Sequence, residues 1–347
     1  MTDRGMEYLG SADVDRALDG IDVVETAAEV LRLHAADLVR TPAKAFLQWP
    51  AEEGAARTLN MPSWLGRPEG PLVGTKIING NPANARFGLR RAEGLILLFD
   101  PETGHVRTMM QAARISALRT AAVTAVAVEH LSAGPPRTLS VIGAGTLAEV
   151  HLEVLVPRLR ELRRLVIHDH DPRRAEKLAA HAAGAWAGRS VDCSTASGAE
   201  EAVAGADVVV TLTTTDEGYI RYGWLKKGSV LVNVSLDDPL PEVFLAADAL
   251  VVDEWGLITA DRRRILGKLH RAGRIAEQGG QGAPALGEGR AVTAHLGEVV
   301  AGTRPARTHE HDIVLVNPIG MSAQDVALAA KVAQRAKPLG LGSVLPH

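Results

Sequence analysis

The hydrophobic positions follow one pattern up to about residue 131 and another after it. Between residues 12 and 39, Val, Leu, Ile and Ala recur at helical spacing with one Asp-Gly interruption, which predicts two consecutive helices. The runs AKAFLQW, RTLNMPSWL, GTKIING and AEGLILLFDPETGHVRTMMQ then have the character of strands. The last run contains the turn sequence DPETG between two β-type halves, which predicts a hairpin. We therefore expect a layer of helices and strands over roughly the first hundred residues.

A long apolar helix is predicted at 115–131 (ISALRTAAVTAVAVEHL), and the following SAGPP stops it, where a change of organisation predicts a domain boundary. From residue 137 onward, short apolar runs such as TLSVIGAG, RRLVIHD, DVVVTLTT and SVLVNVS alternate with helical segments. This alternation is typical of successive βαβ units with a parallel sheet, so the predicted fold class is α/β. The glycine-rich segment 277–290 is predicted to be a loop, and the final helix begins with Ser322 and Asp325 at the spacing of a capping box.

Composition limits the possible partners and location. The net charge of −3 gives no reason to expect a nucleic acid or a membrane surface as a partner, because both require a basic excess. Cys193 is the one cysteine, which excludes an intramolecular disulfide and a thiolate zinc site. The histidine-rich pieces at 168–171 and 309–312 lack convergent partners, so no metal site is expected. Without a signal-like amino terminus or an apolar run of about 18 residues, we expect a cytoplasmic protein.

The segment TLSVIGAGTLAEVH predicts a dinucleotide site, because a strand is followed by Gly143-x-Gly145-x-x-Ala148 and then by a helix. Small residues at these positions let the turn close and the backbone approach a pyrophosphate, whose charge the helix N-terminus attracts. The second strand of this unit ends in Asp169. An acid there accepts hydrogen bonds from a ribose 2′-hydroxyl and repels a 2′-phosphate, which favours NAD, while the arginines at 173–174 keep NADP open.

Charged residues also occur where apolar residues dominate. Arg119 lies in the middle of the apolar helix with no acid within one turn, and Lys76 lies within the run GTKIING. Burying an unpaired cation is costly, so each requires a distant carboxylate or a bound anion, and both alternatives stay open. Asp237 and Asp238 follow the strand SVLVNVS, at the end of a strand where open α/β sheets hold ligands. The local pattern does not choose between these two acids, either of which could cap the next helix.

With these residues in view, the chain resembles the ornithine cyclodeaminase/mu-crystallin family. The matching stretches include GTKIING, DPETG, ISALRTAAVTAVA, VIGAG, WLKKGSVLVNVS, HLGEVVAG and NPIGMSAQD, and they extend over nearly the whole length. The resemblance implies a Rossmann NAD-binding domain at 116–319 and an α+β substrate-binding and dimerisation domain at 1–115 and 320–347. It implies a homodimer formed through the second of these domains. It also selects Asp238 over Asp237, because Asp238 aligns with the catalytic aspartate of the family.

Other stretches are more similar to the branch of this family that makes 2,3-diaminopropionate, the N-(2-amino-2-carboxyethyl)-L-glutamate dehydrogenases. They are PAKAFL, RTLNMPSWLG, DEGYIRYGWLKKG and VLVNPIGMS, and the chain has LDD where cyclodeaminases usually have GGD. The resemblance implies hydride abstraction by NAD and hydrolysis of the imine to 2-oxoglutarate and 2,3-diaminopropionate, in siderophore or peptide antibiotic biosynthesis. The candidate catalytic residues are Lys76 and Asp238, the candidate substrate-binding residues are Lys44, Arg57, Lys76 and Arg119, and the candidate cofactor-binding residues are Gly143, Gly145, Thr146, Leu147, Asp169 and Thr120.

Three alternative activities remain open. An ornithine or lysine cyclodeaminase would reduce its own cyclic imine and release no net NADH. A simpler amino-acid dehydrogenase or ketimine reductase would use the same fold on a smaller substrate. A non-enzymatic role, like the binding role of mu-crystallin, would bind the dinucleotide without turnover. Two roles also remain open for Lys76, contact with a substrate carboxylate and relay of the amine proton.

Overall fold

The structure, a computed structural model, describes residues 5–51, 54–235, 237–277 and 289–346. The chain folds into two compact units, the first made of Met1–Arg119 with Gly320–His347 and the second of Thr120–Ile319. The division falls inside one long helix, α3 (Ala113–Leu131). Within the part of the chain described, no helix is long and apolar enough to cross a membrane. Strands and helices occur in both units, and the predicted α/β class is confirmed.

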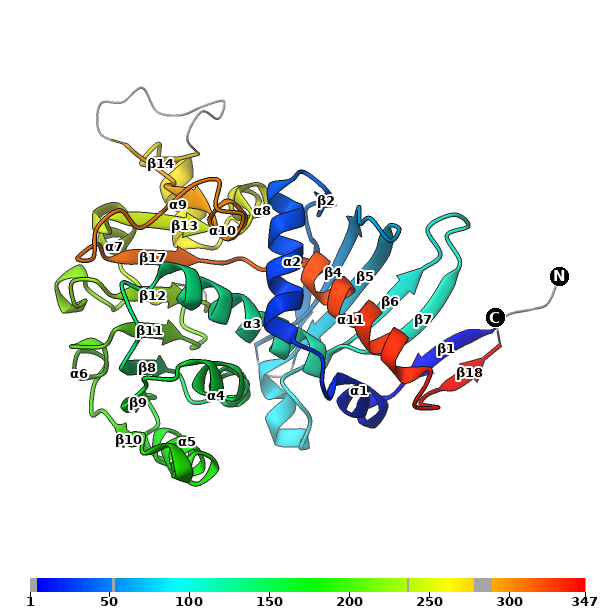
Figure 1. Ribbon diagram of the computed structural model, residues 1–347, viewed down its shortest axis with the longest axis horizontal. Coiled ribbons are helices and arrows are strands. Elements are labelled where there is room, and N and C mark those ends of the chain that lie inside the picture. The colour runs from blue at the N-terminus through cyan, green and yellow to red at the C-terminus, as the bar shows by residue number, and fades with distance from the viewer. Residues whose placement is uncertain (1–4, 52–53, 236, 278–288, 347) are drawn as a thin grey trace. The chain divides into compact units, whose positions relative to one another are not determined.

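The first unit is built on an eight-stranded mixed sheet (Figure 1). Its strands are β1 (Met6–Leu9), β2 (Val39–Arg40), β3 (Ala45–Pro50), β4 (Ala55–Leu65), β5 (Leu72–Gly80), β6 (Ala92–Phe99), β7 (Val106–Gln111) and β18 (Ser343–Leu345). Strands β4 to β7 pair antiparallel in sequence order, and the DPETG turn joins β6 to β7 as predicted. Strand β1 pairs with β7 on one side and with β18 on the other, so the first and last strands of the chain are neighbours.

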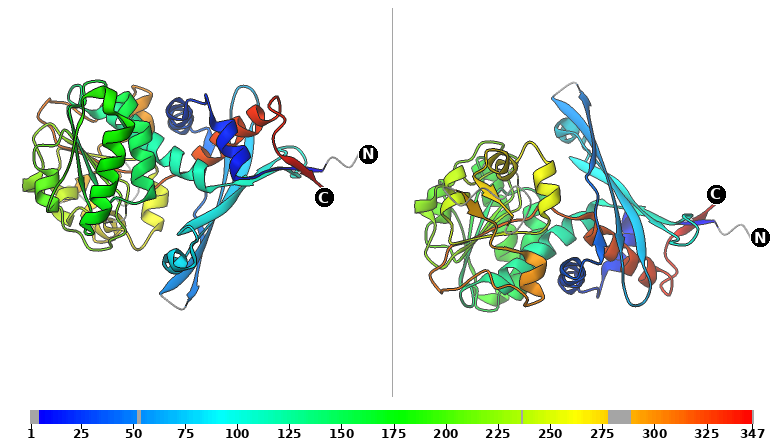
Figure 2. Two further views of the ribbon diagram at one scale, coloured as in Figure 1. Left: turned by 90° about the horizontal axis from the view of Figure 1, so that it is seen from below. Right: turned by 90° about the horizontal axis from the view of Figure 1, so that it is seen from above.

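Three helices of the first unit lie on one face of this sheet (Figure 2). They are α1 (Ser11–Leu18), α2 (Val23–Ala35) and α11 (Ser322–Ala336). The two predicted helices at 12–39 are therefore present, and α2 begins where the Asp22 side chain accepts hydrogen bonds from two backbone N–H groups. Helix α11 packs across β4, β5 and β6. In Figure 2 no α-helix of the unit's described residues covers the opposite face.

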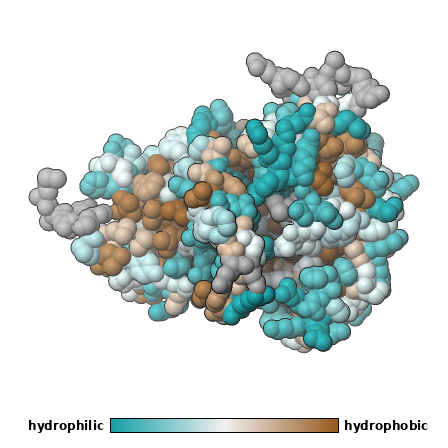
Figure 3. Space-filling view, turned by 180° about the vertical axis from the view of Figure 1, so that it is seen from behind, coloured by the Kyte–Doolittle hydropathy of each residue, from teal (hydrophilic) through white to brown (hydrophobic). Residues whose placement is uncertain are grey.

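The alternation of side chains in the sheet places Lys76 on the face covered by α11. Lys76 of β5 is paired in register with Ile96 of β6, which in turn is paired with Met110 of β7, and all three side chains are buried. The intervening residues of β6, Leu95 and Leu97, point to the opposite face and remain partly exposed. Figure 3, seen from behind the view of Figure 1, shows brown, hydrophobic side chains gathered on this unit.

The second unit is built on a parallel sheet of eight strands in the order β10-β9-β8-β11-β12-β17-β13-β16. The strands are β8 (Thr138–Ile142), β9 (Arg164–His168), β10 (Asp192–Thr195), β11 (Val208–Thr211), β12 (Val230–Asn233), β13 (Ala249–Val252), β16 (Ala294–His295) and β17 (Val314–Asn317). The direction of winding reverses between β8 and β11. In sheets of this kind, ligands bind outside the carboxyl ends of the strands at such a reversal.

Helices in the connections cover this sheet, as expected for strands that are buried on both faces. They are α4 (Thr146–Arg158), α5 (Pro172–Ala185), α6 (Ala199–Val203), α7 (Pro241–Ala246), α8 (Trp255–Ala260), α9 (Ile265–Arg271) and α10 (Leu296–Val300), and a separate ribbon pairs β14 (Ile275–Ala276) with β15 (Arg290–Ala291). The predicted parallel arrangement is confirmed. Most of the predicted loop at 277–290 lies outside the described residues.

The predicted capping box at the start of α11 is wrong. The N-cap residue is Met321, and no side chain caps the helix there. Ser322 instead donates a hydrogen bond to the carbonyl oxygen of Pro62 at 3.2 Å, and Asp325 is fully buried beside Lys76. Asp325 is therefore the partner of a buried cation and not a helix cap, because a buried ammonium without a carboxylate is costly.

Candidate active site

A buried carboxylate meets both of the cations that the sequence singled out in the first unit. The Lys76 Nζ atom of β5 lies 2.8 Å from Oδ2 of Asp325 on α11 and donates a second hydrogen bond, 3.0 Å long, to Oγ of Ser116 on α3. The side chains of Lys76 and Asp325 are 2% and 0% exposed. Of the two alternatives left open for Lys76, a distant carboxylate and a bound anion, the structure supplies the first.

Arg119 shares this carboxylate, but less directly. Its Nε atom lies 3.2 Å from Asp325 Oδ2, yet the N–H does not form a directed hydrogen bond, so the contact is an ion pair and Lys76 is the better bonded partner. The guanidinium also depends on Gly320, which has a φ of +82°. A Cβ atom at position 320 would lie 2.5 Å from Nη1 of Arg119, so a larger residue there would displace the guanidinium.

Burial lowers the pKa of Lys76 to about 8, from an ordinary value of 10.5. The positive charge of Arg119 lowers it further, while the charge and hydrogen bond of Asp325 oppose both effects. Lys76 is therefore charged at pH 7 but close to its titration range. A lysine in this condition can hold a carboxylate as an ammonium or take up a proton as an amine.

The other two predicted substrate-binding residues belong to the same sheet. Arg57 lies on β4 and is paired in register with Gly80, and its position alternates onto the face that carries Met61, the β4 partner of Lys76. Lys44 directly precedes β3, whose first residue, Ala45, is paired with Asn60. Both cations are half-buried. The sheet thus brings Arg57 to the face of Lys76 and places Lys44 at the start of the adjoining edge strand.

In the second unit, the turn after β8 has the geometry of a phosphate-binding turn. Gly143 has a φ of +98°, and a Cβ atom there would lie 2.7 Å from the backbone of Leu212, so only glycine fits. A Cβ atom at Gly145 would meet nothing within 4 Å, which leaves open space in front of the first turn of α4. Thr146 and Leu147 begin that helix, where backbone N–H groups have no helical partner. These residues fit a dinucleotide pyrophosphate.

Asp169 stands directly after β9 and braces this turn. Its Oδ2 atom accepts a 2.7 Å hydrogen bond from the backbone N–H of Ala144, and Oδ1 lies 2.9 Å from Nδ1 of His170. The acid therefore sits where a ribose bound beside the turn would meet it. Arg173 and Arg174, which kept NADP open in the sequence analysis, follow at the start of α5.

Thr120 lies on α3 one helical turn before Thr124, whose hydroxyl is 3.1 Å from Nε2 of His151 on α4. The other ring nitrogen of His151 lies 2.8 Å from the carbonyl oxygen of Leu147. Burial lowers the pKa of His151 to about 4, so the ring is neutral and links α3 to the first turn of α4. Thr120 and Leu147, both predicted to bind the cofactor, therefore lie on two helices that His151 links by hydrogen bonds.

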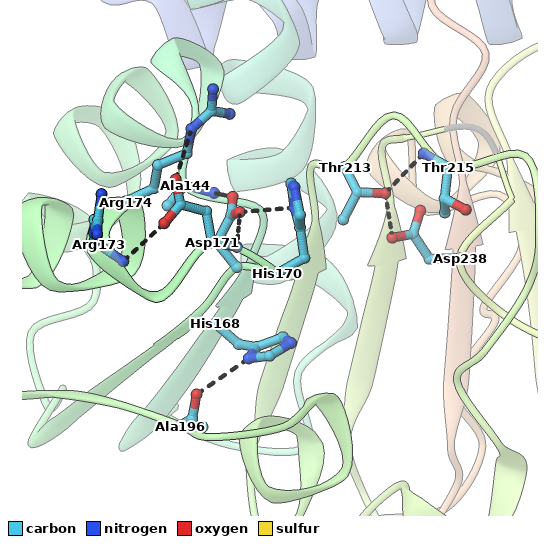
Figure 4. Close-up of polar contacts among 11 residues, drawn as sticks. Ala144, His168, His170, Asp171, Arg173, Arg174, Ala196, Thr213, Thr215 and Asp238 are labelled. Atoms are coloured by element: carbon cyan, nitrogen blue, oxygen red, sulfur yellow. Dashed lines mark hydrogen bonds and ion pairs between the residues drawn. The ribbon is translucent and has the colours of Figure 1, made fainter.

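Asp238 is held by three hydroxyl groups at the carboxyl edge of the sheet, and Figure 4 shows one of them, that of Thr213. Its Oδ1 atom accepts hydrogen bonds of 2.7 Å from both Thr213 and Tyr219, and Oδ2 accepts one from Ser235. Thr213 follows β11, whereas Ser235 and Asp238 follow β12. Burial and the neighbouring carboxylate raise the pKa of Tyr219 well above its usual range, so its hydroxyl keeps its proton and remains a donor.

The local pattern did not choose between Asp237 and Asp238, but the structure gives these two acids different hydrogen-bond partners. Asp237 accepts a 2.7 Å hydrogen bond from the backbone N–H of Ile265, the first residue of α9, and burial raises its pKa. Asp237 therefore accepts a hydrogen bond from a free N–H group at the start of a helix. That helix is α9, and not α7, which follows the two acids in the sequence. Helix α7 has no side-chain cap at all. Asp238, in contrast, is oriented by side-chain hydroxyls from two strand ends.

The sequence analysis missed Asp325, Tyr219, Ser235 and Thr213 as members of these clusters. Asp325 carries the same signal that identified Lys76 and Arg119, a charged residue inside an apolar run, here AQDVALAA. The capping-box interpretation concealed that signal. No local signal identifies the three hydroxyl residues, because serine, threonine and tyrosine are common at strand ends.

The low pKa of Lys76 predicts how stability depends on pH. Because the folded-state pKa of about 8 lies below the unfolded value of 10.5, the unfolded state binds more protons between these limits, and the free energy of unfolding rises with pH. The difference between the wild type and Lys76→Met should grow by about 3 kcal/mol from pH 8 to pH 10.5. Urea unfolding at fixed ionic strength measures it, and parallel pH curves for the two proteins would contradict the prediction.

The chain is similar to known proteins over nearly its whole length. An N-((2S)-2-amino-2-carboxyethyl)-L-glutamate dehydrogenase from Staphylococcus aureus is 31% identical over 349 residues, 99% of this chain and 98% of the relative. The crystal structure of CmnK is 36% identical, with a TM-score of 0.87 and coverage of 99% and 98%. An archaeal alanine dehydrogenase, solved as a dimer with bound NAD, is 25% identical, with a TM-score of 0.80 and 98% coverage of both chains. The family model for the ornithine cyclodeaminase/mu-crystallin family matches residues 11–339, and the chain belongs to this family, as predicted.

Proposed function

We propose that the protein is an NAD-dependent oxidoreductase that cleaves N-(2-amino-2-carboxyethyl)-L-glutamate. The substrate, NAD+ and water give 2,3-diaminopropionate, 2-oxoglutarate, NADH and a proton. The C–H bond on the glutamate moiety is oxidised, and the resulting C=N bond is hydrolysed. The product supplies siderophore or peptide antibiotic biosynthesis, and the protein acts as a cytoplasmic homodimer.

The observation that carries this choice of reaction is the 31% identity to the S. aureus dehydrogenase, which extends over 99% of the chain. Two relatives named for other reactions are less similar along comparable lengths. The alanine dehydrogenase of Archaeoglobus fulgidus is 26% identical over 339 residues, and a Bacillus thuringiensis Δ1-pyrroline-2-carboxylate reductase is 24% identical over 331 residues.

The charge of the cluster in the first unit supports a substrate with several carboxylates. Lys76 and Arg119 contribute two positive charges at pH 7, and Asp325 contributes one negative charge, so the buried cluster has an excess positive charge. An uncompensated buried charge is costly, and a substrate carboxylate would neutralise it. Arg57 and Lys44 add cations on the same sheet for the remaining carboxylates, with arginine suited to a bidentate contact.

The second unit holds the cofactor. Gly143 and Gly145 admit the pyrophosphate, the N–H groups of Thr146 and Leu147 bind it, Asp169 binds the ribose, and Thr120 lies on the helix packed beside them. When bound, NAD+ supplies the hydride acceptor for the reaction.

The two remaining predicted roles concern protons. Two hydrogen bonds occupy two of the three ammonium hydrogens of Lys76, which leaves one for a substrate carboxylate or amine. Because its pKa lies near 8, Lys76 also releases or accepts a proton at moderate pH. Asp238 orients and deprotonates the hydrolytic water, and its three hydroxyl donors keep the carboxylate in one orientation for this task.

The homodimer forms through the face of the first unit's sheet on which Figure 2 shows no α-helix of the described residues. Leu95 and Leu97 of β6 point to this face and are only partly covered in one chain. The neighbouring edge strand β3 adds Leu47 and Trp49, which are 61% and 42% exposed. Large exposed apolar patches mark interaction surfaces, and a second copy of the chain would cover this one.

Purified protein with NAD+ should produce NADH, followed at 340 nm, from N-(2-amino-2-carboxyethyl)-L-glutamate and not from ornithine, lysine or glutamate. Mass spectrometry should detect 2,3-diaminopropionate. Asp238→Asn should lower kcat by about 100-fold or more, whereas the neighbouring Asp237→Asn should keep turnover. Proline from ornithine without net NADH would instead identify a cyclodeaminase, and normal kcat in Asp238→Asn would remove Asp238 from the site.

Asp169→Asn should reduce the preference for NAD over NADP by about tenfold or more in kcat/KM, because the charge that binds the 2′-hydroxyl and repels a 2′-phosphate is lost. The substitution keeps an oxygen that can accept the Ala144 hydrogen bond. Asp171→Asn is a matched control, since Asp171 caps α5 two residues away. An unchanged preference in Asp169→Asn would show that this acid does not contact the ribose.

Light scattering coupled to size exclusion should give the mass of two chains for the wild type. Leu97→Glu should give a monomer at micromolar concentration, because a buried charge on each side of the interface is strongly unfavourable. Leu339→Glu, an exposed apolar position after α11, should remain dimeric. A monomeric wild type, or a dimeric Leu97→Glu variant, would contradict this assembly.

A further inference from the structure

We propose that Asp325 is a positioning residue for Lys76 and Arg119, which fixes the two cations in place and holds Lys76 in its charged form near neutral pH. The catalytic part of this inference rests on the function proposed above. The electrostatic part concerns the folded chain alone and holds whatever the substrate is.

A single oxygen atom of Asp325 contacts both Lys76 and Arg119. Oδ2 of Asp325 lies 2.8 Å from Nζ of Lys76 and 3.2 Å from Nε of Arg119, so it fixes the distance between a strand residue and a helix residue. Asp325 is 0% exposed and its Oδ2 atom already contacts both cations, so we place it behind them and not against the substrate. Its action on the reaction has to pass through the two cations.

Asp325 is also the one source of negative charge at this position. Lys76 faces Asp325 on α11 and Arg119 and Ser116 on α3, while its register partners on β4 and β6 are the apolar Met61 and Ile96. Within the described ranges, no other carboxylate forms an ion pair with Lys76 or Arg119. If the charge of Asp325 were removed, burial and the positive charge of Arg119 would remain. Both lower the pKa of Lys76.

One feature argues against a purely structural role. The second carboxylate oxygen of Asp325, Oδ1, is buried and accepts no hydrogen bond from any described residue. Buried polar atoms that serve stability alone are nearly always satisfied, and an ion pair of this kind can often be replaced by apolar side chains without loss of stability. An incompletely satisfied acid between two cations fits an electrostatic task better.

The first test needs no substrate. Urea unfolding is measured between pH 6 and pH 10.5 for the wild type, Lys76→Met, Asp325→Asn and the double variant. In the wild-type background the stability contributed by Lys76 should rise from about pH 8 upward, as calculated above. In the Asp325→Asn background the rise should begin about 1–3 pH units lower, because the opposing negative charge is gone. Coincident curves in the two backgrounds would overturn the proposal.

Ser116→Ala is the matched control, because it removes the other hydrogen bond to the same ammonium without removing a charge. The rise should stay within about half a pH unit of its wild-type position in this variant. A shift in Ser116→Ala as large as that in Asp325→Asn would mean that lost hydrogen bonding, and not charge, is responsible, and would overturn the proposal.

Asp325→Glu keeps the charge and displaces it by one methylene group, and it provides a test if Asp325→Asn does not fold. Its Lys76-dependent rise should stay near that of the wild type, whereas kcat should fall by about tenfold or more because the two cations are misplaced. A merely structural role predicts wild-type kcat in any Asp325→Glu protein that folds, and that result would overturn the positioning role. If no amino acid is turned over at all, the proposed function fails while the unfolding curves still decide the electrostatic part.

Discussion

One buried carboxylate organises the charged interior of the first unit. Asp325 on α11 meets Lys76 on β5, 249 residues earlier in the chain, and Arg119 on α3. Two cations that would be too costly to bury alone are thereby held in place beside the sheet. Gly320, just before α11, gives Arg119 the room to approach. The position of the C-terminal helix α11 therefore determines the positions of Lys76 and Arg119.

The second unit also buries a carboxylate, and there hydrogen bonds from hydroxyl groups take the place of an ion pair. Asp238 is buried, but hydroxyl groups from Thr213, Tyr219 and Ser235 surround it in place of a cation. Neutral donors leave the negative charge of the carboxylate uncancelled, whereas a lysine partner would cancel it. In the proposed reaction Asp238 takes a proton from water, and a carboxylate without a cation partner suits that role better than one paired with a lysine. The different partners of the two clusters are thus consistent with the roles proposed for them, the binding of anions for the first and action as a base for the second.

Much of this architecture could be predicted because it depends on local pattern. The parallel sheet follows from alternating strand and helix periods, the hairpin from DPETG, and the tight turn from Gly143, where no other residue fits. The pairing of Lys76 with Asp325 could not be predicted in this way, because the local pattern marks each residue as a charge in an apolar run but does not indicate that they meet across 249 residues. Asp325 was assigned to a helix cap since the spacing from Ser322 matches that motif, and burial overrode it. The distinct partners of Asp237 and Asp238 likewise depend on distant elements.

The pairing of the first and last strands has a consequence for synthesis on the ribosome. Strand β18 closes the sheet beside β1, and α11 supplies the acid for Lys76, so the first unit lacks essential parts until the end of the chain emerges. The second unit, continuous from Thr120 to Ile319, has all of its strands well before that point. The second unit can therefore complete its sheet before the first unit does, although its synthesis begins later. The amino-terminal strands lack the cover of α11 and the pairing with β18 until these two elements have been made.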